Sequence, residues 1–580
     1  MLSLVRSLLL MTALLLGAGL AHAASPRPTL LRFVPADIGL CVLMEDLRER
    51  GNALAASPFV ARLTRALPGK GIDGLAEIQQ LLKFEKQIER FTGVPTAKLR
   101  DEVLGDLVVL AYKPGPTGKP DLEEGLVLLH ARDAATLANV VSHVNESQTK
   151  SGELKSVEER THRGQKYYCR LEKDAPTFYH LRGSVLLFTG QESMLRSALD
   201  LDADLGAEAI APLEQSLRRL GIAGSLVTFW INPRAYDTEL LAKWNKAVGD
   251  PSSANEAAFL KTFLSYWKAL DGLALCLQLD ADVSLALAVS ANMEQIPIAG
   301  RRLFASLTEP AQLWRRLPSD PLFALASRLD FKALFDTLAD FLPAEGRQSI
   351  EGELRNTLGA ALGKDVITEL LPALGADVGL ILLPPGREQK GIFPLVMLAL
   401  RVQPTTDLAP VDQALLSGLH TIATLATIAH NRQNPGKPMA FKRSATDQID
   451  VRYLIGDGVF PTGVQPAFSL VRGHLAAASS PEVLRQLAEF LREGPAGPRP
   501  DAVPILRVSF KAWRDYLTDR GDALARQLSE SEGISVEAAS ERLRGWVSAL
   551  EAVEMLEVRH RPAPGRTIVQ ISLKSRWPLK

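Results

Sequence analysis

The chain has 580 residues, of which 46% are hydrophobic and 23% charged, with 66 basic and 66 acidic residues. This length corresponds to about four domain-sized units or two large ones, and the composition is that of a globular chain and not of a disordered one. Because the formal net charge is zero, no bulk electrostatic attraction draws the protein to nucleic acid or to an anionic membrane.

The N-terminal segment has the features of a secretory signal peptide. Arg6 precedes an apolar run from Leu8 to about Leu20, and the tripeptide AHA that ends at Ala23 is an A-x-A cleavage signal. The run is shorter than the roughly 20 residues that a spanning helix needs. We therefore predict that residues 1–23 are a signal peptide and that the protein is periplasmic or extracellular, with an uncleaved membrane anchor as the alternative.

The mature chain is predicted to begin with a strand, a helix and a hairpin. Residues 37–44 alternate between polar and apolar like a strand, and residues 46–67 have helical periodicity. LGDLVVLAYKPG from Leu104 and EEGLVLLHARD from Glu123 then form the two arms of a hairpin.

A helix and several short strands follow. Asp133 is placed to cap a helix that runs through Val144, since a short acceptor satisfies the free N–H groups of a first turn. GQKYYCRL and APTFYHLRGSVLLF are short strand-like runs, and Asn232-Pro233 starts another helix. LALCLQL and VSLALAV are predicted to form a hairpin that closes this part, because the residues Asp280-Ala281-Asp282 between them favour a turn. A membrane-spanning helix is disfavoured, since these aspartates would be costly in lipid.

The chain contains this pattern twice. Aligned positions lie 270 to 290 residues apart, a scatter that loop insertions would produce. The matching segments begin at Phe33 and Arg316, Leu104 and Leu374, Glu123 and Ile392, Arg182 and Arg472, and Tyr266 and Gly545.

We therefore predict an α+β fold with internal duplication. Residues 24–305 and 306–580 form two similar modules, each with a mainly antiparallel β-sheet flanked by helices, because short turns between successive strands favour antiparallel pairing. A linker between the modules is predicted over residues 294–310, and the proline-rich segment 492–504 is a second linker.

The stretch RGSVLLFTGQESMLRSAL has the strand, glycine and helix order of a phosphate-binding unit. Such a site usually adds a lysine with a serine or threonine, but this stretch has Gly190 after its strand and no lysine. Its counterpart after Arg472 has Ser479-Ser480-Pro481, which predicts a capping hydroxyl and a proline at the first helical position. We interpret both versions as scaffold.

Two further patterns match part of a ligand-binding motif. GKGIDG, residues 69–74, satisfies G-x-G-x-x-G but follows a helix end, whereas a dinucleotide site follows a strand. Asp200, Asp202 and Asp204 have the spacing of the first ligands of a calcium loop, but its glycine and its last glutamate are missing. A solvated acidic turn at a helix end is the preferred interpretation.

Cysteines and histidines show no catalytic or metal-binding spacing either. Cys41, Cys169 and Cys276 each lie in an apolar strand-like run, and we predict buried thiols although export would place them in an oxidising compartment. His420 and His430 are ten residues apart on a predicted helix, which turns them to different sides. The sequence thus indicates no catalytic, cofactor-binding or metal residue.

The opening FVPADIGLCVLMEDL with the long helix after it, and the units HLRGSVLLFTGQESMLRSAL and SLVRGHLAAASSPEVLRQL, resemble a known family. It is an uncharacterised family of exported bacterial proteins, catalogued as domain of unknown function 3352. The similarity is a pattern over most of the mature chain. The resemblance implies an extracytoplasmic bacterial protein without an assigned activity and supplies no functional residues.

Three functions remain open. The predicted one is a non-enzymatic binding or scaffold protein, for example a carrier of an apolar ligand, because duplicated modules place two similar faces side by side. Its partner is an unknown ligand or envelope protein, with no cofactor, no nucleic acid and no transmembrane helix in the mature chain.

The alternative is an envelope hydrolase with dispersed catalytic residues. A third is that one copy has become a structural partner, since the cysteines occur only in the first copy.

Overall fold

The computed structural model describes residues 26–56, 85–119, 122–206, 209–222, 224–279, 282–316, 320–386, 391–403, 410–446, 449–491 and 502–575. The predicted signal peptide, the GKGIDG segment, the end of the first long helix and most of the proline-rich linker lie outside these residues. Helices and strands are mixed along the chain and the strands pair antiparallel, so the predicted α+β class is confirmed.

The strands fall into two sets of ten along the described chain. Those before residue 300 are β1 (Leu40–Glu45), β2 (Leu107–Lys113), β3 (Glu124–His130), β4 (Leu154–His162), β5 (Gln165–Glu172), β6 (Thr177–Arg182), β7 (Val185–Thr189), β8 (Val227–Ile231), β9 (Leu270–Leu279) and β10 (Val283–Ala291). Those after it are β11 (Phe323–Arg328), β12 (Leu374–Leu383), β13 (Leu395–Val402), β14 (Ala440–Thr446), β15 (Ile449–Ile455), β16 (Ala467–Val471), β17 (His474–Ala478), β18 (Val503–Ser509), β19 (Val553–Ala563) and β20 (Arg566–Ser575).

The helices connect these strands, and short turns of 3-10 or π helix are labelled η. The first half contains α2 (Arg27–Leu31), α3 (Leu47–Ala56), α6 (Thr96–Lys98), η2 (Leu99–Val103), α7 (Ala134–Ser151), α8 (Glu192–Asp204), α9 (Pro212–Leu220), η4 (Pro233–Tyr236), α10 (Asp237–Gly249), η5 (Pro251–Ser253), α11 (Ala254–Ala269) and α12 (Ile298–Ser306). The second half contains η6 (Gln312–Arg316), α13 (Phe331–Ala339), α14 (Ala344–Leu354), η7 (Arg355–Gly359), α15 (Ala360–Leu362), η8 (Val366–Leu370), α16 (Leu371–Ala373), α17 (Val411–Gln433), α18 (Pro481–Phe490), α19 (Phe510–Asp519), α20 (Gly521–Glu532), α21 (Val536–Ala549) and η9 (Leu550–Ala552).

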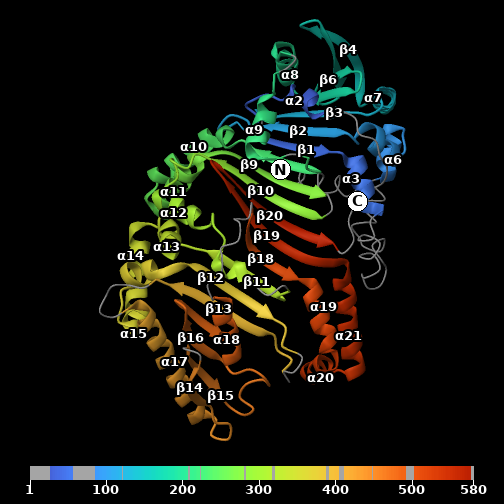
Figure 1. Cartoon of the computed structure of the whole chain (residues 1–580). Helices are drawn as coiled ribbons and strands as arrows, with labels where there is room; N and C mark the ends of the chain where they lie inside the picture. Colours follow the sequence, from blue (N-terminus) through green and yellow to red (C-terminus); the bar gives the residue numbers. More distant parts are fainter. Residues whose placement is uncertain are drawn as a thin grey trace.

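All the described strands belong to one open antiparallel sheet that runs the length of the molecule (Figure 1). Its order is β4-β5-β6-β7-β3-β2-β1-β8-β9-β10 in the first half and then β20-β19-β18-β11-β12-β13-β17-β16-β15-β14. The two halves have the same strand order when each is followed from its outer edge to the centre of the sheet. β4 of the first half corresponds to β14 of the second, β5 to β15, and so on to β10 and β20. The halves meet where β10 pairs with β20, from Val283 opposite Leu573 to Ser290 opposite Arg566.

The predicted hairpins are confirmed. β2 pairs with β3 and β12 with β13, and β9 and β10 pair around the turn that was predicted to interrupt this apolar segment. The basic segment RTHRGQKYYCR also forms a hairpin, in which His162 pairs with Gln165 around Arg163 and Gly164. Both turn residues have positive φ, 48° and 78°, as a tight two-residue hairpin requires.

The two Arg-Gly dipeptides that were matched in the sequence do not occupy the same place. Arg182 is the last residue of β6 and pairs with Val185, so its turn consists of Gly183 and the serine after it. Arg472 is itself the first turn residue, with a φ of 47°, between Val471 and its partner His474. In the structure Gly183 therefore corresponds to Arg472. This correspondence is shifted by one residue from the alignment of the two Arg-Gly dipeptides in the sequence.

Several predicted helix boundaries need correction. The strand predicted over residues 37–44 is β1, and the helix after it is described only as far as Ala56. Asp133 caps α7 as predicted, since its Oδ1 accepts the N–H of Thr136 at 2.5 Å. The helix continues past Val144 to Ser151 and ends at Gly152, whose φ of 77° permits a left-handed cap. The last turns of α7 consist mainly of polar, solvent-facing residues, so the apolar periodicity that predicts a helix is absent there.

Two more local predictions differ from the structure. Ser480 is the N-cap of α18 and Pro481 its first residue, but the Ser480 side chain makes no capping hydrogen bond. The Ser479 hydroxyl instead accepts the N–H of Val396 at 3.0 Å and fastens the helix start to β13. The linker predicted over residues 294–310 contains α12, which packs against α13 of the second half.

Each half buries a core on both sides of the sheet. On one side, α2, α8 and α9 cover the first half, and α18 with η6 covers the second. On the other side, α3, η2 and α7 cover the outer strands of the first half, while α17 covers the outer strands of the second. The middle strands receive less cover on this second side.

A single buried carboxylate holds three cations together near the middle of the sheet. Glu557 on β19 has a side chain 2% exposed and lies 2.8 Å from Arg507, 2.5 Å from Arg559 and 3.0 Å from Lys574. Burial opposes its ionisation, but the Lys574 hydrogen bond and the charges of Arg559 and Lys574 outweigh burial and hold the pKa of Glu557 below its ordinary value.

Glu557→Gln is expected to destabilise the protein by about 3 kcal/mol at neutral pH, since it leaves three neighbouring cations without their counter-charge. Because the folded-state pKa is lowered, this stabilisation is present above the unfolded pKa and is lost as the pH falls through the folded value. Denaturation midpoints from pH 7 down to pH 3 should therefore fall more steeply for the wild type than for the variant. Glu256→Gln, an exposed carboxylate on α11, is the control, and equal slopes would contradict the assignment.

Candidate functional site

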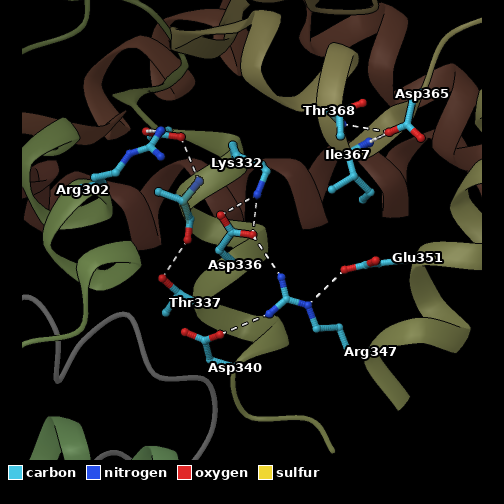
Figure 2. A network of polar contacts seen from close by, with 12 residues as sticks. Arg302, Lys332, Asp336, Thr337, Asp340, Arg347, Glu351, Asp365, Ile367 and Thr368 are labelled. Carbon is cyan, nitrogen blue, oxygen red and sulfur yellow. Dashed lines mark hydrogen bonds and ion pairs between the residues drawn. The ribbon is translucent and has the colours of Figure 1, made fainter. Parts of the chain in front are cut away.

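A network of ion pairs joins helices α13 and α14 (Figure 2). Arg347 lies 3.7 Å from Asp336, 3.4 Å from Asp340 and 3.0 Å from Glu351. Lys332 lies 2.6 Å from Asp336. Each carboxylate of this network faces a cation, so the network positions the helices and offers no free acid or base.

The acidic triplet that matches half of a calcium loop, and that was predicted to be a solvated acidic turn at a helix end, lies on a helix. Asp200, Asp202 and Asp204 occupy the last turns of α8. Asp200 and Asp204 lie 2.8 Å and 2.5 Å from Arg163, and Asp202 lies 3.3 Å from Arg32. These ion pairs fasten α8 to the β4–β5 turn and to the end of α2, in place of the solvated turn that was predicted. Within the part of the chain that the structure describes, no three His, Cys, Asp or Glu side chains are grouped to hold a metal ion.

The cysteines are buried thiols, as predicted. Cys41, Cys169 and Cys276 lie on β1, β5 and β9, and none of the three is in a disulfide. Burial raises the pKa of each thiol, which keeps it protonated and unreactive at neutral pH. His420 contacts the ring of Phe441, whereas the Nε2 of His430 lies 2.9 Å from the Lys437 carbonyl, so the two histidines make separate contacts.

The feature that stands out is a set of exposed apolar side chains on one side of the middle strands. Each is between 38% and 47% exposed, although it lies within a sheet and not at its edge. Residues that pair across strands point to the same side, and the pairings place all of them on one side, here called the apolar face. Its exposed members are Leu275, Leu285, Leu287, Ile571, Leu325, Val396 and Leu398.

An unbroken row of apolar partners crosses seven neighbouring strands on this face. Neighbouring strands lie about 4.8 Å apart, so the row is about 29 Å long. The row consists of Leu285 on β10, Ile571 on β20, Val558 on β19, Leu506 on β18, Leu325 on β11, Leu380 on β12 and Leu398 on β13, each paired directly with the next.

The apolar face is bounded on all sides by other elements. Toward β1 it continues under α3, η2 and α7, where Val42, Val108 and Val227 are buried. Toward β16 and β17 it continues under α17. Helices also stand at both ends of the strands, with α10 to α15 along one margin and α3, α19 and α21 along the other (Figure 1). The open part is therefore a bordered apolar floor between β9 and β13.

A cavity of about 670 Å³ lies beside α19, next to the end of β12. Its lining includes Asp320, Asp515 and Asp519 together with Tyr516 and Arg520. The carboxylate of Asp515 lies 2.9 Å from Lys511, the Tyr516 hydroxyl donates to the carbonyl of Ile392, and Arg520 donates to the carbonyl of Gly386 at 2.6 Å. The three carboxylates in its lining distinguish this cavity from the apolar face.

Comparison with known proteins identifies no relative for this chain. No protein-family model matches it, and no curated protein or solved structure is significantly similar to it.

The sequence contained a signal for the apolar face that the hairpin interpretation did not use. In β10 the large residues Val283, Leu285 and Leu287 alternate with serine and alanine, and in β9 Leu275 and Leu277 alternate with alanine and cysteine. Most residues on both sides of these strands are apolar or small, so hydropathy alone does not show which side is covered. Side-chain size does, because the small residues pack below α9 while the large ones project to the open side.

The three thiols are expected to resist alkylation in the folded protein at pH 8, because burial hinders both deprotonation and access. Iodoacetamide labelling followed by intact mass should give fewer than about one adduct per ten chains, and three adducts per chain after unfolding in guanidinium. Rapid labelling of one cysteine in the folded protein would instead support a nucleophilic thiol.

Proposed function

We propose that this protein is an exported, non-enzymatic carrier that binds a long-chain apolar ligand on the apolar face. The observation that carries the proposal is the row of apolar side chains from Leu285 to Leu398, whose members are exposed or half-buried although they lie in the middle of the sheet. Exposed apolar patches bordered by other structure mark binding surfaces in soluble proteins. A strand face of this kind is otherwise covered by helices or by a second sheet.

The length of the row supports a long-chain ligand. The hydrocarbon core of a bilayer is about 30 Å thick and is filled by two acyl chains end to end, so one acyl chain covers about half of that. A row of about 29 Å accommodates one extended chain with room to spare, or two in line. Lipids and free fatty acids have this shape, whereas a compact ligand would leave most of the row in water.

We propose further that the two halves arose by duplication, as residues 24–305 and 306–580. Support comes from the strand order, which is the same in both halves when read inward from the edges of the sheet. Duplication provides a physical reason for the long row. Two modules joined edge to edge double the width of the sheet, while the covering helices remain near the outer part of each module.

Export remains a prediction from the N-terminal segment, and it fits a lipid carrier. An apolar ligand does not cross an aqueous envelope compartment unaided, because its transfer into water is unfavourable. The resemblance to an exported bacterial family points to the same compartment and names no ligand.

A native mass spectrum of the protein purified from its own cell envelope is expected to show a mature chain that starts at Ala24 together with a bound lipid. Fragmentation of the complex would identify the lipid, and organic extraction should return the mass to that of the bare chain. A mature chain that carries no ligand, and that takes up none from added fatty acids, would contradict the proposal.

The double variant Leu285→Thr, Leu287→Thr is expected to weaken binding of a fluorescent long-chain fatty acid by about tenfold, since the contacts of two leucine side chains with the bound acyl chain are lost. Threonine is compatible with a strand, and both positions are partly exposed, so the fold should be retained. Val157→Thr on edge strand β4 is the matched control, because Val157 is 39% exposed and lies outside the row. Equal affinities for the double variant and the control would contradict the assignment.

A further inference from the structure

Helix α17 is apolar on the side that faces solvent. Ile422, Leu425 and Ile428 follow one another at intervals of three residues and are 64%, 60% and 61% exposed. The opposite side of the same helix packs on the sheet through Leu416 and Ala423. A surface helix normally has a polar outer side, so the outer side of α17 requires a partner.

The corresponding helix of the first half lacks this feature. Helix α7 follows β3 and precedes the β4–β5 hairpin, as α17 follows β13 and precedes the β14–β15 hairpin. Its exposed positions include Asn139, Ser142, His143 and Glu146. Packing on the sheet therefore does not require an apolar outer side at this place in the fold, and the difference belongs to α17 itself.

The charges around α17 indicate the kind of partner. Between Asp412 and Asp447 the chain contains no acidic residue, and its four basic residues there are Arg432, Lys437, Lys442 and Arg443. Arg432 lies one turn beyond Ile428 and is exposed, and Lys437 follows it on the exposed turn. Arg443 is paired with Asp450 at 2.5 Å. An apolar ridge that ends in unbalanced positive charge is complementary to the surface of an anionic bilayer.

We infer that the outer side of α17 docks the protein on the surface of an anionic lipid bilayer. Ile422, Leu425 and Ile428 enter the interface between headgroups and acyl chains, and Arg432 and Lys437 contact lipid phosphates. Among the described residues no helix is long and apolar enough to cross a membrane. α17 therefore lies on the bilayer, and its buried side stays packed on the sheet.

The docking surface and the apolar face share one side of the sheet. α17 covers the continuation of that side on β16 and β17, through Phe468 and Leu475, and occupies the lower left margin of the molecule beside the β14–β15 hairpin (Figure 1). A bilayer beneath α17 therefore lies on the side from which the apolar face is open. Docking is a separate property from ligand binding, and each can be lost without the other.

The test is flotation of the mature chain with vesicles of about three parts phosphatidylethanolamine to one part phosphatidylglycerol. The triple variant Ile422→Gln, Leu425→Gln, Ile428→Gln is expected to reduce the bound fraction at least about tenfold, because three apolar contacts with the interface are lost. Arg432→Gln should reduce binding by about fivefold on these vesicles and have little effect on neutral phosphatidylcholine vesicles. High salt should have the same selective effect.

The matched control is Asn139→Gln, Ser142→Gln, His143→Gln on α7, which should bind vesicles like the wild type. Thermal midpoints and fatty-acid binding of both triple variants should stay unchanged, since the altered positions are exposed and lie outside the apolar row. Absence of wild-type binding to anionic vesicles would overturn the inference. So would equal vesicle binding by the α17 variant, or a wild-type dimer that the α17 variant converts to a monomer without any vesicle binding.

Discussion

The antiparallel pairing of β10 with β20 is the interaction on which the rest of this structure depends. Each of these strands is the last of its half, and without the other it would present a row of unpaired N–H and C=O groups to solvent. Their pairing satisfies both edges at once and makes one sheet of the two halves. The remaining edges, β4 and β14, carry charged residues such as Glu158 and Arg443, which disfavour further strand addition.

A sheet of this width has more surface than the chain covers. The helices of each half pack on most of its strands on one side and on the outer strands of the other side, where α3, η2 and α7 occupy one end and α17 occupies the other. The strands nearest the junction keep large apolar residues on a side where helices reach only the ends of the strands, as α3 does at Val283 and α19 does at Leu382. The apolar face is thus a consequence of edge-to-edge joining, and a long apolar ligand can take the place of the missing layer.

The two halves share a strand order and differ in what they expose. The first half contains all three cysteines, each packed in its core, and its helix α7 is polar on the outside. The second half contributes most of the exposed apolar row and the apolar outer side of α17. Both halves contribute to the apolar face, since Leu275, Leu285 and Leu287 belong to the first half, whereas the apolar outer side belongs to α17 of the second half.

Local sequence determined the hairpins, the Asp133 cap, the buried cysteines and the order of elements, because turn chemistry, capping and periodicity depend on residues close together in the chain. Tertiary structure decided the rest. The alternation in β9 and β10 predicted strands but not which side is covered, since cover depends on helices far away in the sequence. Asp200 and its neighbours were predicted to be a solvated acidic turn, and their ion pairs with Arg163 and Arg32 depend on segments that only the fold brings beside them. The junction of β10 with β20, and with it the apolar face, joins residues almost 300 positions apart, and no local pattern encodes such a contact.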